Sequence, residues 1–296
     1  MDEKKKLKVS LCLIFLFICI AIIILYFSTL LEKRANEDVY EAIMASKINS
    51  QYENILLGDS VSRQIFNVYN QKEDEKFYHL NSNQAIGVIG NYILLKNYLK
   101  QNTKVRNIYY IVRPWSLTNN LNQPYTYGYF VLPFLSEEEN FKYVPKPILK
   151  RWQEAKKYYK YFFYKNTIKI LEKNPNFILK ILKINLEDSN FKISQEQAYL
   201  SEMSVIYLKE IEKLCKEYGI NFKLISSPLS SKYKYENFSK LKNEVNKYGL
   251  ARIFNDYFHS IDYYPEDKFR DEVHFEKEFL EQNIVELQEN MYKKFK

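Results

Sequence analysis

Two short segments, far apart in the sequence, carry residue types that could work together in catalysis. The segment Gly58-Asp59-Ser60 directly follows an apolar run that is typical of a buried strand. Asp271 and His274 lie three residues apart, just before a long helical pattern. A serine nucleophile, a histidine base and an aspartate that orients the base are the parts of serine-dependent acyl transfer. The chain has only 3 histidines, so few side chains could act as a base near neutral pH.

Each segment also has a purely structural interpretation. Gly-Asp-Ser is common in turns and helix caps, and Asp271 could cap a helix beside an unrelated surface histidine. Against this, a serine between a strand and a helix exposes its Oγ at the carboxyl edge of a sheet, where helix N–H groups can stabilise an oxyanion. The two segments together favour catalysis, with Ser60 as nucleophile, His274 as base and Asp271 as the group that orients it.

The elements that must position these residues follow an alternating pattern. Strands are expected over residues 52–57, 76–80, 107–112 and 221–226. Helices are expected over residues 61–69, 90–100, 202–218, 238–248 and 276–294. Strands that alternate with helices predict an α/β fold with a parallel sheet covered on both faces.

The beginning of the sequence predicts a membrane anchor. Lysines precede an uncharged run from Val9 to Leu31, which exceeds the ~20 residues that a membrane-spanning helix needs. A cleaved signal peptide is the alternative, but its apolar region is usually shorter and ends in small residues. We therefore expect an anchor over residues 1–31 with a cytoplasmic N-terminus, a polar helical stalk over 32–50, and an extracytoplasmic domain over 51–296.

The alternation breaks between residues 121 and 194, which we interpret as an insertion in the domain. This stretch is rich in Tyr, Phe and Lys and contains several prolines, and residues 151–171 are typical of an aromatic, basic helix. Its aromatic side chains could simply pack the insertion against the core. They could instead form a substrate groove or touch a membrane surface, with Trp152 as one contact.

Composition excludes several other classes of function. The formal charge of +8 comes from scattered lysines and not from one concentrated basic face, so no nucleic-acid partner is expected. The cysteines and histidines show no zinc spacing, and neither a metal nor another cofactor is expected. Cys215 lies alone in a helical pattern and is expected to be a buried thiol. His79 and His259 are expected to be structural.

The two catalytic segments resemble the conserved blocks of a known superfamily. Residues 55–60 (Ile-Leu-Leu-Gly-Asp-Ser) look like the first block of the SGNH, or GDSL-type, hydrolases, and residues 269–275 look like their last block, Asp-x-x-His. Residues 81–112 are similar to the membrane-anchored branch that includes DltD and the alginate O-acetylation proteins. The resemblance implies a flavodoxin-like three-layer αβα sandwich in which Ser60, Asp271 and His274 form the triad.

The resemblance is weaker in the blocks that would build the oxyanion hole. Besides the Ser60 N–H, the second block should supply a backbone N–H, from either Ala85 or Gly87. The third block should supply an asparagine, but the strand here ends in Val112-Arg113-Pro114. The membrane-anchored branch often lacks that asparagine.

Three further residues are expected to bind substrate. Asp59 directly precedes the nucleophile, and Arg113 follows the strand expected over residues 107–112. Arg63 lies one helical turn after Ser60, where it could meet an anionic or hydroxyl-rich ligand or simply lie on the surface.

Together, the residues and the resemblance predict an O-acetyltransferase or esterase. The substrate would be a cell-envelope polysaccharide or related glycan, with a membrane-bound acyltransferase as a possible partner. Whether water or a sugar hydroxyl takes the acyl group stays open, because both routes share one acyl-enzyme. A catalytically silent accessory that binds a glycan or a membrane acyltransferase is the alternative, and the incomplete oxyanion blocks favour it.

Overall fold

The computed structural model describes residues 10–19, 36–66, 76–121, 125–135, 140, 199–236 and 238–295. These residues form a mixed α/β fold around a four-stranded parallel sheet with the strand order β2-β1-β3-β4. The strands are β1 (Asn54–Gly58), β2 (Phe77–His79), β3 (Asn107–Ile111) and β4 (Asn221–Ile225). A separate two-stranded parallel pair joins β5 (Leu229–Ser230) to β6 (Tyr263–Tyr264). The α/β fold and its parallel sheet are as the alternating pattern predicts.

Successive residues of each central strand point to opposite faces of the sheet, and both faces are buried. In β1, Ile55 and Leu57 belong to one apolar cluster while Leu56 belongs to the other. A strand that is buried on both faces reads as a continuous apolar run, which is why these strands are visible in the sequence.

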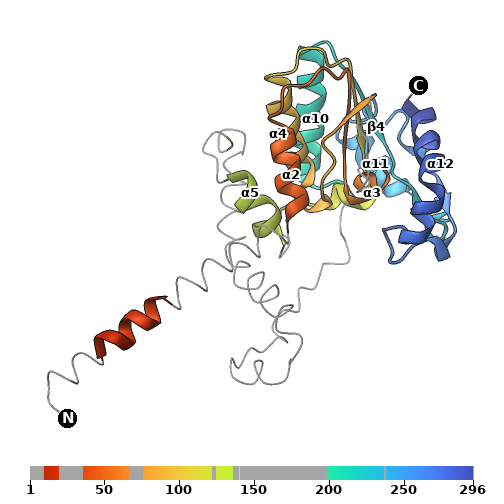
Figure 1. Cartoon of the computed structure of the whole chain (residues 1–296). Helices are drawn as coiled ribbons and strands as arrows, with labels where there is room; N and C mark the ends of the chain where they lie inside the picture. Colours follow the sequence, from red (N-terminus) through yellow and green to blue (C-terminus); the bar gives the residue numbers. More distant parts are fainter. Residues whose placement is uncertain are drawn as a thin grey trace, which may run out of the picture.

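Helices cover both faces of the sheet (Figure 1). One face is covered by α2 (Glu37–Ala45), α4 (Gly87–Leu99), α10 (Glu202–Glu217) and α11 (Ser239–Lys247). The other face is covered by α3 (Ser60–Phe66) and α12 (Lys277–Phe295). On the first face, Cys215 is 1% exposed, and burial raises the pKa of its thiol to about 12, as expected of a structural cysteine.

The prediction of a membrane-spanning helix is wrong for the part of the chain that the structure describes. No helix there is both long enough and apolar enough to cross a bilayer. Of the uncharged run over residues 9–31, the described part is a helix over residues 10–19, and the remainder lies outside the described residues. The expectation of a single-pass membrane protein is corrected accordingly.

The polar stalk predicted over residues 32–50 is also corrected. Its described part contains α2, which packs on the core and does not stand apart from it. Val39, Ala42 and Ile43 recur at helical spacing and are all buried. The Asn36 side chain also donates to the carbonyl of Gly128, so α2 is joined to a distant segment.

Part of the predicted insertion belongs to the same core. Tyr127–Val131 and α5 (Leu132–Leu135) follow one another, and Phe130 and Phe134 stack with ring centroids 5.3 Å apart. Both rings are buried, so these aromatic residues pack the segment down. Trp152 and the helix predicted over 151–171 lie outside the described residues.

The strand order determines where a site can form. The chain passes from β1 outward to β2 and then returns to place β3 on the other side of β1. Loops after β1 and β3 therefore leave in opposite directions and open a crevice at the carboxyl edge of the sheet. Ser60 directly follows β1, so it lies at this crevice.

Candidate active site

Ser60 is the first residue of α3, immediately after the turn that leaves β1. The turn is tight because Gly58 lies against the next helical turn and the neighbouring strand. A Cβ at Gly58 would lie 2.4 Å from the Ser62 Oγ and 2.6 Å from the Ile111 carbonyl oxygen. Only glycine permits this approach, so the sequence Gly-Asp-Ser fixes where the serine leaves the sheet.

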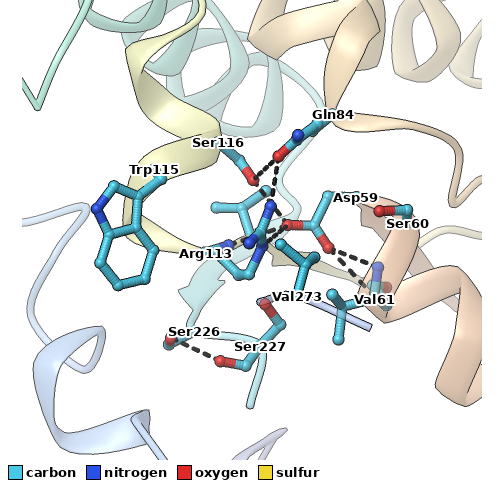
Figure 2. Close-up of polar contacts among 12 residues, drawn as sticks. Asp59, Ser60, Val61, Gln84, Arg113, Trp115, Ser116, Ser226, Ser227 and Val273 are labelled. Carbon is cyan, nitrogen blue, oxygen red and sulfur yellow. Dashed lines mark hydrogen bonds and ion pairs between the residues drawn. The ribbon is translucent and has the colours of Figure 1, made fainter. Parts of the chain in front are cut away.

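Asp59 is buried, and its two oxygens hold two neighbouring turns together (Figure 2). Oδ1 accepts the backbone N–H groups of Val61 at 3.1 Å and Ser62 at 3.3 Å, which caps α3. Oδ2 accepts the backbone N–H of Arg113 at 3.1 Å and the hydroxyl of Ser116 at 2.8 Å. Both oxygens are therefore engaged inside the protein, and the expectation that Asp59 binds substrate is corrected to a structural role.

Arg113 belongs to the same buried network. Its Nη2 donates to the Oε1 of Gln84, and its Nε lies 3.7 Å from the Asp59 Oδ2 (Figure 2). The side chain is 6% exposed, so its charge is balanced by Asp59 inside the protein. Arg113 thus supports the turn after β3, and it also lines the cavity described below.

The base comes from a short loop that closes on itself. Phe269 and Phe275 form an isolated antiparallel bridge, and their rings stack with centroids 4.5 Å apart. Between them, the Asp271 Oδ1 accepts the backbone N–H groups of Val273 and His274, both at 2.7 Å. Asp271 therefore shapes the same loop that presents the imidazole.

The structure brings the three predicted triad residues together, with His274 between Ser60 and Asp271 and within hydrogen-bonding distance of both. The His274 Nε2 lies 2.8 Å from the Ser60 Oγ, and its Nδ1 lies 3.0 Å from the Asp271 Oδ2. With the Nδ1–H directed at the carboxylate, Nε2 is left to accept the serine proton.

The carboxylate of this arrangement stays charged over a wide pH range. Partial burial would raise the pKa of Asp271, but hydrogen bonds from the His274 N–H, the imidazole and the Val273 N–H lower it to about 2. The carboxylate therefore keeps a negative charge next to the His274 Nδ1, where the aspartate of a serine triad lies.

The oxyanion donors differ from the predicted ones. The Ala85 N–H donates to the Asn83 Oδ1 at 2.9 Å, and the Gly87 N–H donates to the Gln84 carbonyl, so neither is free. In the described part of the chain, the N–H groups of Ser60 and Asn83 donate to no acceptor. The Ser82 N–H bonds the Gly58 carbonyl at 3.1 Å, which brings Asn83 close to the serine turn.

The guanidinium of Arg63 is paired with two carboxylates of α2. Its Nη2 donates to the Glu41 Oε2 at 2.7 Å, and its Nη1 lies 3.9 Å from the Asp38 Oδ2. Burial raises the pKa of Asp38, an effect that the nearby guanidinium opposes. Arg63 therefore joins α3 to α2, and the prediction that it binds substrate is wrong.

A cavity of about 320 Å³ lies against the loop that carries the base, although Ser60, Asp271 and His274 are not among its lining residues. Its walls include Glu272 and Val273, which lie between Asp271 and His274 in the sequence. The remaining lining residues are aromatic or polar: Gln84, Arg113, Trp115, Ser116, Thr118, Asn119, Tyr125 and Tyr233. It is a polar cavity with aromatic walls, so it suits a ligand that offers both hydroxyl groups and apolar faces.

Sequence reasoning missed Gln84 and Ser116, which complete the network around Asp59. The Ser116 hydroxyl bonds the Asp59 Oδ2 at 2.8 Å and lies 3.3 Å from the Gln84 Oε1. No local pattern marks either residue, because their partners lie on other loops.

Comparisons with known proteins leave the site to be judged on its geometry. No protein-family model and no curated protein sequence matches the chain. One solved structure, described as "a putative platelet activating factor from Streptococcus pneumonia", aligns over 93% of this chain and 99% of its own length, with 8% identity and a TM-score of 0.38. A similarity at that level carries no argument about fold or activity.

Proposed function

We propose that this protein hydrolyses acyl esters, or transfers their acyl groups, through a covalent intermediate on Ser60. The observation that carries the proposal is the continuous contact from the Ser60 Oγ through the imidazole of His274 to the Asp271 carboxylate, at 2.8 Å and 3.0 Å. A hydroxyl is a weak nucleophile alone, and an adjacent base held by a third group is what activates it.

The chemistry follows from this geometry. The Ser60 Oγ attacks the ester carbonyl while its proton passes to the His274 Nε2, and Asp271 stabilises the resulting imidazolium. The negative oxygen of the tetrahedral intermediate would lie by the N–H groups of Ser60 and Asn83. The imidazolium then returns the proton to the leaving alcohol, which leaves an acyl-serine. Water or another hydroxyl, deprotonated by the same imidazole, releases the acyl group and restores the serine.

The cavity against the loop of the base supports a hydroxyl-rich alcohol as the part of the ester that carries the acyl group. Trp115 and Tyr233 lie with ring centroids 4.4 Å apart on its wall, next to amide and hydroxyl side chains. Aromatic faces combined with hydrogen-bonding groups suit a sugar ring. We therefore propose a small acyl group, such as acetyl, carried by a glycan, in keeping with the resemblance of the two catalytic segments to SGNH-type hydrolases.

The proposal is tested with p-nitrophenyl acetate in the presence and absence of acceptor sugars, followed by mass spectrometry of the products. We expect acetate release, and acetylated sugar if transfer occurs. A serine-directed fluorophosphonate should modify Ser60 in the wild-type protein and react far more slowly in His274→Ala, which lacks the base. A wild-type protein that shows neither turnover nor labelling contradicts the proposal.

One observation favours a second candidate, a catalytically silent module that binds a glycan. The Ala85 and Gly87 N–H groups are used inside the protein, and no asparagine follows β3 directly, which leaves few donors for an oxyanion. Under this alternative, acetylated oligosaccharides would bind equally well to the wild-type protein and to Ser60→Ala, and neither protein would release acetate. Isothermal titration with both proteins distinguishes the two functions.

A further inference from the structure

Gln64 makes a pair of hydrogen bonds between the helix that carries the nucleophile and the loop that carries the base. It lies four residues after Ser60 in α3, on the same side of the helix. Its Nε2 donates to the Phe275 carbonyl at 3.0 Å, and its Oε1 accepts the Phe275 N–H at 3.1 Å. The backbone N–H and C=O of one residue, Phe275, are thus both satisfied by a single side chain, as a neighbouring antiparallel strand would satisfy them.

The location of this pair relates it to the proposed chemistry. Phe275 directly follows His274, and its ring is 0% exposed in the apolar cluster beneath α3. Apart from the Ser60–His274 contact itself, Gln64 supplies the hydrogen bonds between α3 and residues 269–275 in the described part of the chain. The bonds inside the loop fix its shape, but they do not fix its distance from Ser60.

We infer that Gln64 is a positioning residue that sets the separation of the Ser60 Oγ and the His274 Nε2 through the backbone of Phe275. The inference rests on the proposed function insofar as that separation governs turnover. Hydrogen-bonded proton transfer needs heavy atoms about 2.6–3.2 Å apart, and a displacement of about 1 Å can lower a rate by about 10²-fold.

The chain offers a matched control in Gln288. This glutamine lies on α12, and its Nε2 donates to the Ile65 carbonyl at 2.8 Å. It therefore also joins α3 to the C-terminal part of the protein through an amide, but it does not touch the loop that holds His274. Substitution of Gln288 measures how far weaker attachment of α3 alone lowers activity. Substitution of Gln64 measures that effect together with the effect of displacing His274.

The kinetic test compares Gln64→Met with Gln288→Met in the full chain, because methionine keeps the volume and removes the hydrogen bonds. With p-nitrophenyl acetate, we expect kcat to fall about 10- to 100-fold in Gln64→Met while KM changes less than about twofold. Gln288→Met should keep kcat within about twofold of wild type. If Gln64→Met does not fold, Gln64→Glu, which keeps an acceptor for the Phe275 N–H, takes its place.

A spectroscopic readout separates this inference from the proposed function. With only 3 histidines, ring ¹⁵N spectra of histidine-labelled protein can be assigned by means of His274→Gln. We expect the His274 Nε2 signal of Gln64→Met to move toward its position in Ser60→Ala, and that of Gln288→Met to stay at the wild-type position. An unchanged Nε2 signal in Gln64→Met, or the same change in Gln288→Met, overturns the inference. If the wild-type protein shows neither ester turnover nor labelling of Ser60, the proposed function fails, while this spectrum still decides the role of Gln64.

Discussion

The nucleophile and the base of the candidate site are held in opposite ways. Asp59, beside Ser60, is 2% exposed and joins two strand ends through a buried network. Asp271, beside His274, has a side chain that is 46% exposed, and its bonds stay within its own loop. The sheet places the nucleophile, whereas local loop geometry, the buried Phe275 ring and contacts from Gln64 and Lys232 place the base. Changes near Ser60 should therefore act mainly on stability, and changes near His274 mainly on activity.

The largest expected effect is the loss of turnover without a loss of folding in His274→Ala. Removal of the base should lower kcat about 10⁴-fold or more, because the Ser60 hydroxyl then keeps its proton. Asp271→Ala should be milder, since the imidazole remains. The thermal midpoint of His274→Ala should stay near the wild-type value. A large drop in that midpoint would contradict the expectation that changes near His274 act mainly on activity.

The second effect is a loss of stability in Asp59→Ala. This change leaves the Arg113 cation buried with its charge unbalanced and removes the cap of α3. Breaking a buried ion pair costs about 3–5 kcal/mol, and urea unfolding should show a decrease of that order. Asp59→Asn, which keeps the shape and some acceptors, should lose less. A decrease in unfolding free energy of less than about 1 kcal/mol in Asp59→Ala would mean that the buried network around Asp59 contributes little to stability.

Gly58→Ala, in the turn that leads to Ser60, should produce a smaller loss of stability. The added Cβ would overlap the Ser62 side chain and the Ile111 carbonyl, and overpacking of this kind costs about 1–3 kcal/mol. Gly249→Ala is the control, because a Cβ there meets nothing within 4 Å and feels only the strain of a positive φ. Equal unfolding midpoints for the two variants would argue against a specific clash at Gly58.

The smallest effect concerns the pH dependence of stability in the loop of the base. Because the folded pKa of Asp271 is about 2 and its usual value is 3.8, this carboxylate stabilises the fold above about pH 4. That contribution is lost as the pH falls through about 2. Since the side chain is well exposed, we expect no more than about 1 kcal/mol. The difference in unfolding free energy between wild type and Asp271→Asn should shrink as the pH falls from about 4 to about 2.

Much of the sheet was accessible from the sequence, because buried parallel strands are continuous apolar runs that turn residues interrupt. The predicted strand over residues 107–112, for example, is β3 (Asn107–Ile111). The helix α2 was misjudged as a polar stalk because its apolar stripe is only Val39, Ala42 and Ile43. A narrow apolar stripe among charged residues does not show whether the helix packs on a hydrophobic core.

The candidate site shows the same limit at the level of side chains. Residue type and spacing predicted that Ser60, Asp271 and His274 could meet, because an Asp-x-x-His spacing is local and a serine after a strand has a defined place. The partners of Arg63 and Gln64 lie on other elements, so neither the ion pair with Glu41 nor the bonds to Phe275 leaves a local signal. The prediction of Ala85 or Gly87 as an oxyanion donor was wrong for a related reason. A sequence does not show which backbone N–H groups already donate to acceptors inside the protein.

The contact between Ser60 and His274 joins residues that are 214 positions apart in the sequence. During synthesis, the serine therefore leaves the ribosome long before the histidine is made. A nascent or truncated chain that ends before the loop at residues 269–275 holds the nucleophile without its base and should be chemically inert. A reagent that depends on activated Ser60 would report chains that have been completed and folded, and it would ignore the unfinished ones.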